Sequence, residues 1–208
     1  MLKVKEIFYS LQGEGYNTGR PAVFVRFSGC NLWSGRDVDR NKSPCFFCDT
    51  GFIGGCVYTE SDLAEKIIST WRGGGQMFVV FTGGEPTLQL KDSLLSVVRQ
   101  KLGKDKQVVN FAIETNGTTD VTYQAPVWVT VSPKTKDFLR RSGNELKLLW
   151  PLENLHPSEL DELDFRYKYL QPIDDENYEE NVRTAVEFCL DNSTWRLSMQ
   201  QHKLLGIR

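Results

Sequence analysis

Residues 77–86 read Met77-Phe78-Val79-Val80-Phe81-Thr82-Gly83-Gly84-Glu85-Pro86 and join an apolar run to a polar turn. The apolar run is typical of a strand that is buried on both faces of a parallel sheet. The Gly-Gly-Glu-Pro turn leaves bare backbone and one carboxylate at the end of that strand. We therefore predict a buried parallel strand whose carboxyl end receives the amino group of a ligand.

Strand and helix patterns alternate along the rest of the chain. Further strands are predicted over 2–9, 22–27, 108–113, 127–131, 145–150, 166–170 and 195–199. Helices are predicted over 59–72 with Thr59 as N-terminal cap, over 88–102 ending at Gly103, and over 175–190 with Asp175 as cap. This order implies right-handed βαβ units and an α/β fold with a mostly parallel sheet.

Polar motifs follow four of the predicted strands. They are residues 82–86, Glu114-Thr115-Asn116-Gly117, Ser132-Pro133-Lys134 and Gln171-Pro172. Ligands bind at the carboxyl ends of the strands in parallel α/β sheets and barrels. Four such motifs on one rim therefore predict one site.

Length and composition are those of a soluble globular chain with a sizeable core. The 208 residues are 40% apolar and 25% charged, with 25 Lys and Arg against 27 Asp and Glu. No long basic run points to nucleic acid or a membrane surface, and no apolar run reaches the roughly 18–20 residues of a membrane span. The first residues lack the apolar core of a secretory signal. We expect a cytoplasmic protein with one domain over 1–208 and no nucleic-acid or membrane partner.

Three of the five cysteines lie within nineteen residues, which favours metal binding over disulfides. Cys45 and Cys48 form a C-x-x-C motif, and fourteen residues separate Cys30 from Cys45. Three thiolates can hold a [4Fe–4S] cluster and leave its fourth iron open. A structural zinc site with Cys56 as fourth ligand explains the cysteines alone equally well. We expect Cys56 to be a loop residue outside the cluster and Cys189 to be part of the core.

The cysteines and the Gly-Gly-Glu-Pro turn together resemble the radical S-adenosylmethionine enzymes. Phe47 stands where these enzymes commonly carry an aromatic residue near the adenine, which favours the iron–sulfur cluster over zinc. Their commonest cysteine spacing, C-x₃-C-x₂-C, is shorter than the spacing in this chain. The polar segment 31–44 can loop out, within a cluster-binding loop over about 28–57.

Nearly the whole chain is similar to one family of this group, the 7-carboxy-7-deazaguanine synthases. The matching segments are residues 11–15, 48–50, 81–86, 113–117, 132–134 and 169–172. The resemblance implies an incomplete (β/α) barrel, a homodimer, and conversion of 6-carboxy-5,6,7,8-tetrahydropterin to 7-carboxy-7-deazaguanine with loss of ammonia in queuosine biosynthesis. It also implies a [4Fe–4S] cluster, S-adenosylmethionine, Mg²⁺, and a reductase or flavodoxin-type electron donor.

The resemblance further implies roles for individual residues. The cluster ligands would be Cys30, Cys45 and Cys48, and Thr50 would bind Mg²⁺. The expected S-adenosylmethionine contacts are Phe47, Asp49, Gly84, Glu85, Glu114, Ser132, Lys134, Gln171 and Asp174. The expected contacts with the pterin substrate are Gln12, Gly13, Glu14, Arg26 and Thr82.

Some assignments stay open from the sequence alone. Arg26 faces away from Val25 and Phe27 on its strand, so it either lines the barrel and binds a carboxylate or is a surface charge. His202 can reach the site from the tail, although an isolated surface histidine is the simpler interpretation. Two other functions remain: a radical enzyme that abstracts hydrogen from a glycine of a partner protein, and a zinc-binding interaction module. Residues 12–15 and 49–50 favour the pterin enzyme over the first of these.

Overall fold

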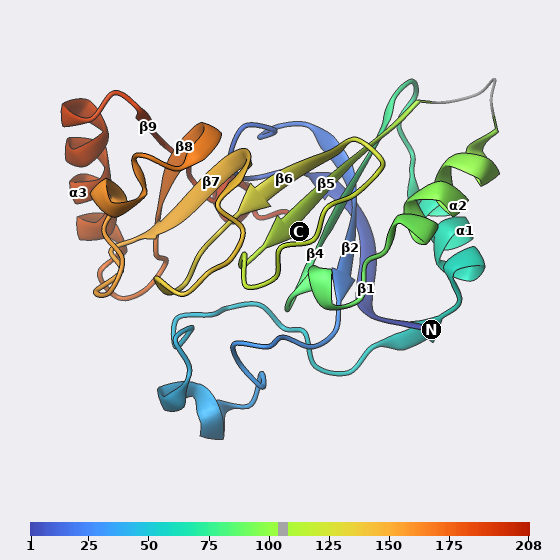
Figure 1. Ribbon diagram of the computed structural model, residues 1–208, viewed down its shortest axis with the longest axis horizontal. Helices are drawn as coiled ribbons and strands as arrows, with labels where there is room; N and C mark the ends of the chain where they lie inside the picture. Colours follow the sequence, from blue (N-terminus) through green and yellow to red (C-terminus); the bar gives the residue numbers. More distant parts are fainter. Residues whose placement is uncertain (104–107) are drawn as a thin grey trace.

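One mixed sheet of nine strands runs through the computed structural model, which describes residues 1–103 and 108–208 (Figure 1). The strands are β1 (Leu2–Leu11), β2 (Pro21–Phe27), β3 (Cys56–Tyr58), β4 (Met77–Gly83), β5 (Val109–Thr115), β6 (Val127–Val131), β7 (Ser142–Trp150), β8 (Asp164–Pro172) and β9 (Trp195–Leu197). Their order is β3-β1-β2-β4-β5-β6-β7-β8-β9. β1 is antiparallel to β2 and β3, and the remaining neighbours are parallel. The described part of the sheet does not close, which confirms the predicted mostly parallel, incomplete barrel.

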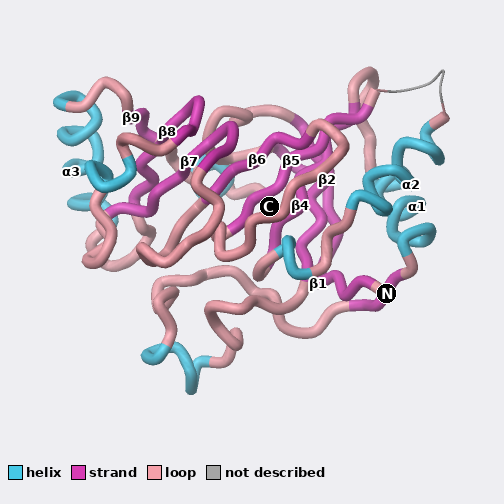
Figure 2. Tube along the Cα trace, in the orientation of Figure 1, coloured by secondary structure: helices cyan, strands magenta, loops and turns pink. Residues whose placement is uncertain are grey.

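Two α-helices lie at one end of the sheet, α1 (Glu60–Thr70) and α2 (Asp92–Leu102), and a third, α3 (Tyr178–Asp191), lies at the other end (Figure 2). The chain also forms the short helix α4 (Gln201–Leu205) and the short 3₁₀ turns η1 (Asp37–Lys42), η2 (Pro86–Leu88) and η3 (Pro157–Leu160). In the described residues β5, β6 and β7 follow one another without an intervening α-helix, so the alternation is less regular than predicted. Across the same residues, no helix is long and apolar enough to cross a membrane.

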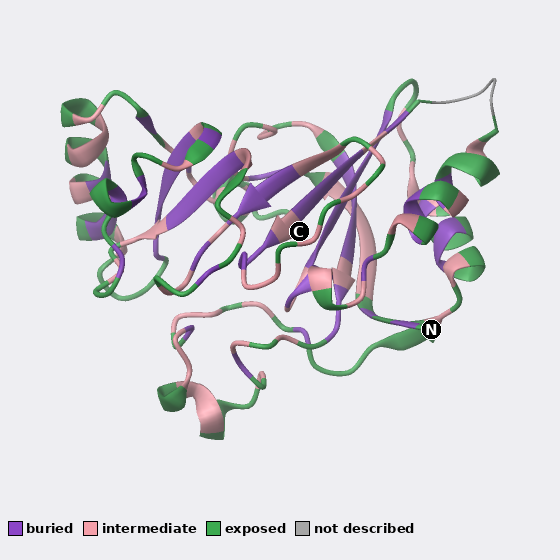
Figure 3. Cartoon of the chain, viewed as in Figure 1, coloured by how far each residue is buried: buried purple, intermediate pink, exposed green. Residues whose placement is uncertain are grey.

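The two faces of the sheet bury different side chains. On β2, Val23, Val25 and Phe27 belong to the large core that also holds the buried faces of α1 and α2. Ala22 and Phe24 alternate with them and pack in a smaller cluster on the other face. Buried residues cover most of the central strands, as Figure 3 shows. The second face continues toward the carboxyl ends of the strands, where polar residues replace the apolar ones.

The helix predicted from Leu88 starts later, at Asp92. Gln89 leaves the helical conformation because its side chain is bound by tertiary partners. Its Nε2 donates to the carbonyl oxygen of Ser28 (2.8 Å), and its Oε1 accepts from the backbone N–H of Lys3 (2.8 Å). The other end agrees with the prediction, since Gly103 terminates α2 with φ 77°.

Two differences concern the carboxyl-terminal third. α3 begins at Tyr178 and not at Asp175, because the Asp175 carboxylate accepts from Asn177 N and Asn181 Nδ2 in a turn that precedes the helix. The last strand ends at Leu197, and the short helix α4, which the sequence did not predict, follows it. The predicted N-terminal cap of α1 is confirmed, since Thr59 Oγ1 accepts from the backbone N–H of Asp62 (3.1 Å).

The segment between β2 and β3 projects from the body of the sheet (Figure 1). It carries the three clustered cysteines and the turn η1. Trp33 and Phe52 are buried within it, with their ring centroids 5.6 Å apart. This polar segment therefore has an aromatic contact of its own, which the expectation of a looped-out insertion did not include.

Candidate active site

A cavity of about 650 Å³ lies at the carboxyl ends of the parallel strands. Six neighbouring strands, or the turns after them, contribute lining residues. In order from β2 to β8 these are Arg26, Thr82, Glu114, Ser132, Lys147 and Gln171. The four polar motifs predicted to share one rim meet in this cavity.

Three thiols line the cavity, those of Cys30, Cys45 and Cys48. Cys56 is exposed at the start of β3 and Cys189 packs against the core from α3, and neither lines the cavity. Burial raises the pKa of Cys30, and it raises the pKa of Cys45 to about 11. Over residues 1–103 and 108–208, no three His, Cys, Asp or Glu side chains converge closely enough to hold a single metal ion. Three thiols around one cavity can hold three irons of a [4Fe–4S] cluster and leave its fourth iron open.

The Gly83–Gly84 pair lets the end of β4 lie directly against the turn that carries Cys30. A Cβ on Gly84 would lie 2.0 Å from the carbonyl oxygen of Gly29 and 3.0 Å from the Cβ of Cys30. Gly83 has φ 134°, and a Cβ there would lie 2.3 Å from the carbonyl oxygen of Phe27. Any side chain at these positions would displace the turn, so the glycine pair places the first thiol.

Glu85 lies outside the lining of the cavity, and the expected contact between its carboxylate and a ligand stays a prediction. The residue is 0% exposed and is not part of the lining. Its Oε1 accepts from Thr87 N (3.0 Å), Thr87 Oγ1 (2.6 Å) and Thr115 Oγ1 (2.7 Å). Its Oε2 accepts from Asn116 N (2.7 Å). The buried carboxylate is fully occupied by protein donors and joins the turn after β4 to the end of β5.

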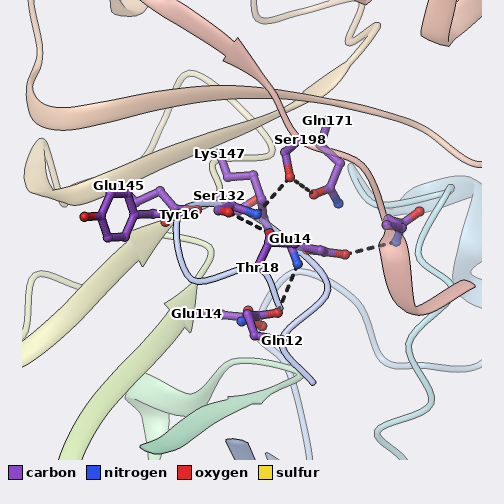
Figure 4. Close-up of polar contacts among 12 residues, drawn as sticks. Gln12, Glu14, Tyr16, Thr18, Glu114, Ser132, Glu145, Lys147, Gln171 and Ser198 are labelled. Carbon is purple, nitrogen blue, oxygen red and sulfur yellow. Dashed lines mark hydrogen bonds and ion pairs between the residues drawn. The ribbon is translucent and has the colours of Figure 1, made fainter. Parts of the chain in front are cut away.

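Glu14 and Lys147 form a buried ion pair in the cavity wall (Figure 4). Burial by itself raises the pKa of Glu14, but the Lys147 ammonium outweighs burial and lowers that pKa to about 2. Burial lowers the pKa of Lys147, while the carboxylates of Glu14 and Glu114 raise it above its usual value. Both groups are therefore charged at neutral pH.

The loop that carries Glu14 is fixed by amide and hydroxyl groups (Figure 4). Gln12 Nε2 donates to Glu114 Oε1 (2.9 Å). Ser198 Oγ accepts from the backbone N–H of Gly15 (3.0 Å) and donates to Gln171 Oε1 (3.0 Å). The loop before β2 is thus joined to β5 and to the end of β8, and its polar groups face one space.

Arg26 lines the cavity and is not a plain surface charge, while its binding of a ligand carboxylate stays a prediction. It lies beside Thr82 in the parallel register of β2 and β4. Its Nε donates to Glu6 Oε1 (2.8 Å), and Glu6 is also paired with Arg208 near the end of the chain. One edge of the guanidinium is held by a carboxylate of the protein, and among the described residues neither Nη group donates a hydrogen bond to the protein.

A second buried ammonium group belongs to Lys134, whose Nζ donates to Ser132 Oγ (2.7 Å). Burial lowers the pKa of Lys134. Both residues line the cavity beside Cys45 and Lys147. Two lysines in one wall make the cavity suitable for a ligand with carboxylate groups.

Asp49 and Asp174, two of the predicted site residues, both accept a hydrogen bond from Lys203, which was not among the predicted residues. Lys203 Nζ donates to Asp49 Oδ2 (2.6 Å) and to Asp174 Oδ2 (2.7 Å). This pair of contacts joins the cysteine-bearing loop to the turn after β8. Phe47 and Thr50 also line the cavity, as expected for neighbours of Cys48.

Lining residues on β7 and in the tail belong to none of the motifs predicted from the sequence: Lys147, Gln200 and Lys203. Lys147 had a detectable signal, because it alternates with the buried residues Leu146 and Leu148. His202 lines the cavity as well, and its Nδ1 lies 2.4 Å from where a Cβ on Gly13 would be. The interpretation of His202 as an isolated surface residue is therefore wrong.

Comparisons with known proteins agree on one family. No family model matches the chain. The 7-carboxy-7-deazaguanine synthase of Caulobacter vibrioides is 46% identical over 213 residues, and that of Burkholderia multivorans is 44% identical over 212, with 98% of each chain covered in both cases. The protein of the same name from Bacteroides thetaiotaomicron is 38% identical over 210 residues, with both chains fully covered. The crystal structure of QueE from Escherichia coli is similar with a TM-score of 0.67 at 27% identity, over 95% of this chain and 93% of that one.

Proposed function

This chain belongs to the 7-carboxy-7-deazaguanine synthase family, and we propose that it converts 6-carboxy-5,6,7,8-tetrahydropterin to 7-carboxy-7-deazaguanine with loss of ammonia. The observation that carries this proposal is one cavity that combines three thiols with the loop of Gln12 and Glu14. The thiols suit an iron–sulfur cluster, and the loop offers acceptors and donors for a nitrogen-rich ring. The product belongs to queuosine biosynthesis.

The cluster would be held by Cys30, Cys45 and Cys48, with S-adenosylmethionine beside it. When bound, the cluster and S-adenosylmethionine supply the one-electron chemistry that protein side chains cannot provide. The protein positions the cofactor through residues on the rim of the sheet. The proposed contacts are Phe47, Asp49, Gly84, Glu114, Ser132, Lys134, Gln171 and Asp174. Glu85 would act on this set indirectly, by fixing the ends of β4 and β5.

The pterin would be held by groups from the loop before β2 and from β2 itself. Because its pKa is about 2, Glu14 stays ionised at neutral pH and accepts hydrogen bonds from amino and ring N–H groups. Gln12 and the backbone of Gly13 lie next to it in the lining. The free edge of Arg26, with Thr82 beside it, would bind the substrate carboxylate.

A Mg²⁺ ion near Thr50 would share that carboxylate. Mg²⁺ prefers oxygen ligands and keeps several waters, so one hydroxyl oxygen and a substrate carboxylate fit part of its shell. Thr50 lies two residues after Cys48 and lines the same cavity, which supports a metal site beside the proposed cluster. The substrate carboxylate would then bind both the Arg26 guanidinium and the Mg²⁺ ion.

Four further properties complete the proposal. We expect a homodimer, a reductase or flavodoxin-type electron donor, and a cytoplasmic location, in one domain over residues 1–208. Size-exclusion chromatography with light scattering tests the dimer. A monomer at working concentration would contradict it.

The direct test of function is an anaerobic assay with the carboxypterin, S-adenosylmethionine, a reductant and Mg²⁺, read by mass spectrometry. We expect a product with the mass of 7-carboxy-7-deazaguanine. The reconstituted protein should be brown, as iron–sulfur proteins are, whereas a zinc protein is colourless. A brown protein that cleaves S-adenosylmethionine but never forms this product would limit the assignment to a radical S-adenosylmethionine enzyme of unknown substrate.

A further inference from the structure

Arg40 lies in η1, within the fourteen residues that separate Cys30 from Cys45. Its Nη1 donates to the carbonyl oxygens of Phe46 (2.8 Å) and Cys48 (2.9 Å). Its Nε and Nη2 donate to Asp37 Oδ1 at 3.2 and 3.0 Å. The guanidinium of Arg40 therefore connects the insertion between Cys30 and Cys45 to the backbone of Phe46 and of Cys48.

The guanidinium also rests on a fixed platform. The Cζ of Arg40 lies 4.3 Å from the ring centroid of Trp33. Trp33 is 7% exposed, packs edge-on against Phe52, and donates from Nε1 to the carbonyl oxygen of Arg36 (3.2 Å). A planar, delocalised cation can stack on this ring and donate to two carbonyl groups at the same time.

Contacts between residues close in sequence hold the rest of the cysteine turn, which we define as residues 45–48. The backbone N–H of Cys48 donates to the carbonyl oxygen of Cys45 (3.0 Å), and that of Cys45 donates to Ser43 Oγ (2.9 Å). Ser43 Oγ donates in turn to the carbonyl oxygen of Leu32 (3.1 Å). In the described part of the chain, Arg40 is the one side chain that donates hydrogen bonds to the carbonyl oxygens of both Phe46 and Cys48.

We propose that Arg40 is the positioning residue for the second and third cluster thiols. The proposal rests on the proposed function, in which Cys45 and Cys48 are cluster ligands. Ordering a long polar insertion costs conformational entropy. By binding the two carbonyl groups, Arg40 restricts the backbone of the turn and keeps both thiols directed to the cavity. The long insertion thereby supports the cluster site through its own residue.

Arg36 provides a matched control in the same segment. Its side chain is 68% exposed, against 33% for Arg40. Within the described residues its guanidinium donates to Asp39 Oδ2, at 3.0 and 2.8 Å, and not to residues 45–48. Removing Arg36 takes away the same charge from the same segment without touching the carbonyl groups of Phe46 and Cys48. Arg36 is exposed and η1, which carries Arg40, contains no buried residue, so neither change removes part of the core.

The test compares Arg40→Ala, Arg40→Lys and Arg36→Ala in anaerobically reconstituted holoprotein. An iron chelator is added, and the decay of the cluster absorbance near ~400 nm is followed. We expect both Arg40 variants to lose the cluster about tenfold faster than wild type, because lysine cannot replace two hydrogen bonds and the stacking. Arg36→Ala should decay at the wild-type rate.

A second readout separates geometry from charge. The cluster reduction potential should become more negative in Arg40→Ala, where a nearby positive charge is lost, and stay near wild type in Arg40→Lys. Wild-type decay in Arg40→Ala, or equally fast decay in Arg36→Ala, would overturn the proposal. If the wild-type protein takes up no cluster at all, the proposed function itself fails, and the two failures are thus distinguishable. Unfolding of the apoprotein should be the same in all four proteins.

Discussion

Glu14 and Lys147 lie 133 positions apart in the sequence and meet as an ion pair in the wall of the cavity. Their side chains are only 14% and 7% exposed. A buried charge whose partner is removed costs far more than an exposed one, because it can neither be solvated nor neutralised easily. We therefore expect this pair to contribute both to the stability of the fold and to the geometry of the proposed substrate site.

Lys147→Met should lower the free energy of unfolding of the apoprotein by about 3–5 kcal/mol, since it leaves the Glu14 carboxylate buried without its partner. Urea unfolding measures the change. The double variant Glu14→Gln/Lys147→Met should recover a large part of the loss. Arg183→Ala is the control, because the Arg183 side chain is 56% exposed and its ion pairs should contribute less than about 1 kcal/mol. Equal effects at Lys147 and Arg183 would contradict the buried pair.

The same pair predicts a pH dependence with a definite sign. The pKa of Glu14 is lowered from 4.5 to about 2 in the folded protein, so its contribution is present above pH 4.5 and is lost as the pH falls toward 2. The stability difference between wild type and Lys147→Met should shrink over this window. Unfolding curves at several pH values between 6 and about 2.5 would show it, and a constant difference would argue against an ionised Glu14.

Alanine at Cys30, Cys45 or Cys48 should each abolish the cluster absorbance near ~400 nm in reconstituted protein. The reason is that each thiol of the cavity would supply one iron ligand. Cys56→Ala and Cys189→Ala are the controls and should keep the band, because neither thiol lines the cavity. Loss of the cluster in Cys56→Ala would revive a four-cysteine site.

Glu85→Gln should lower the free energy of unfolding by about 1–3 kcal/mol, because an amide –NH₂ would face a donor where the carboxylate now accepts. The affected contacts are those with Thr87, Thr115 and Asn116. Glu153→Gln, at an exposed position, should change stability little. Calorimetric titration with S-adenosylmethionine completes the test. Weaker binding at unchanged stability would mean that the carboxylate touches the cofactor after all.

Arg26→Lys should raise the KM for the carboxypterin about tenfold or more, since lysine keeps the charge and loses the two-pronged contact with a carboxylate. The uptake of the cluster and the binding of S-adenosylmethionine should persist. Arg183→Lys, on the outer face of α3, should leave KM unchanged. A wild-type KM in Arg26→Lys would place the substrate carboxylate elsewhere.

Thr50→Ala should remove most of the stimulation by Mg²⁺ while the cluster spectrum persists, because a methyl group cannot replace an oxygen ligand. Thr50→Ser is the matched control and should retain the stimulation. Activity is measured over a Mg²⁺ titration with the carboxypterin as substrate. Full Mg²⁺ dependence in Thr50→Ala would exclude Thr50 as a ligand.

The hydrophobic pattern predicted the strands correctly where a run of apolar and β-branched residues is buried in the sheet. The run Met77–Phe81 and the segment 127–131 are strands as expected. Both are short apolar runs rich in residues that favour strands, and both are buried for most of their length. The starts of α2 and α3 were misplaced, since Gln89 and Asp175 make contacts outside the helix pattern. Helix propensity depends on neighbouring residues in the sequence, so it does not predict side-chain contacts of this kind.

The sequence by itself determined the sheet class, the rim of polar motifs and the set of three thiols, because strand period, glycine turns and cysteine spacing are local properties. Only the tertiary structure decided how each charge is used. It buried the Glu85 carboxylate among protein donors, and it brought Lys147 to Glu14 and Lys203 to Asp49 and Asp174. These partners come from distant strands and from the tail. Their pairing depends on how the open sheet and the tail fold around one cavity, and the spacing of residues along the chain does not specify it.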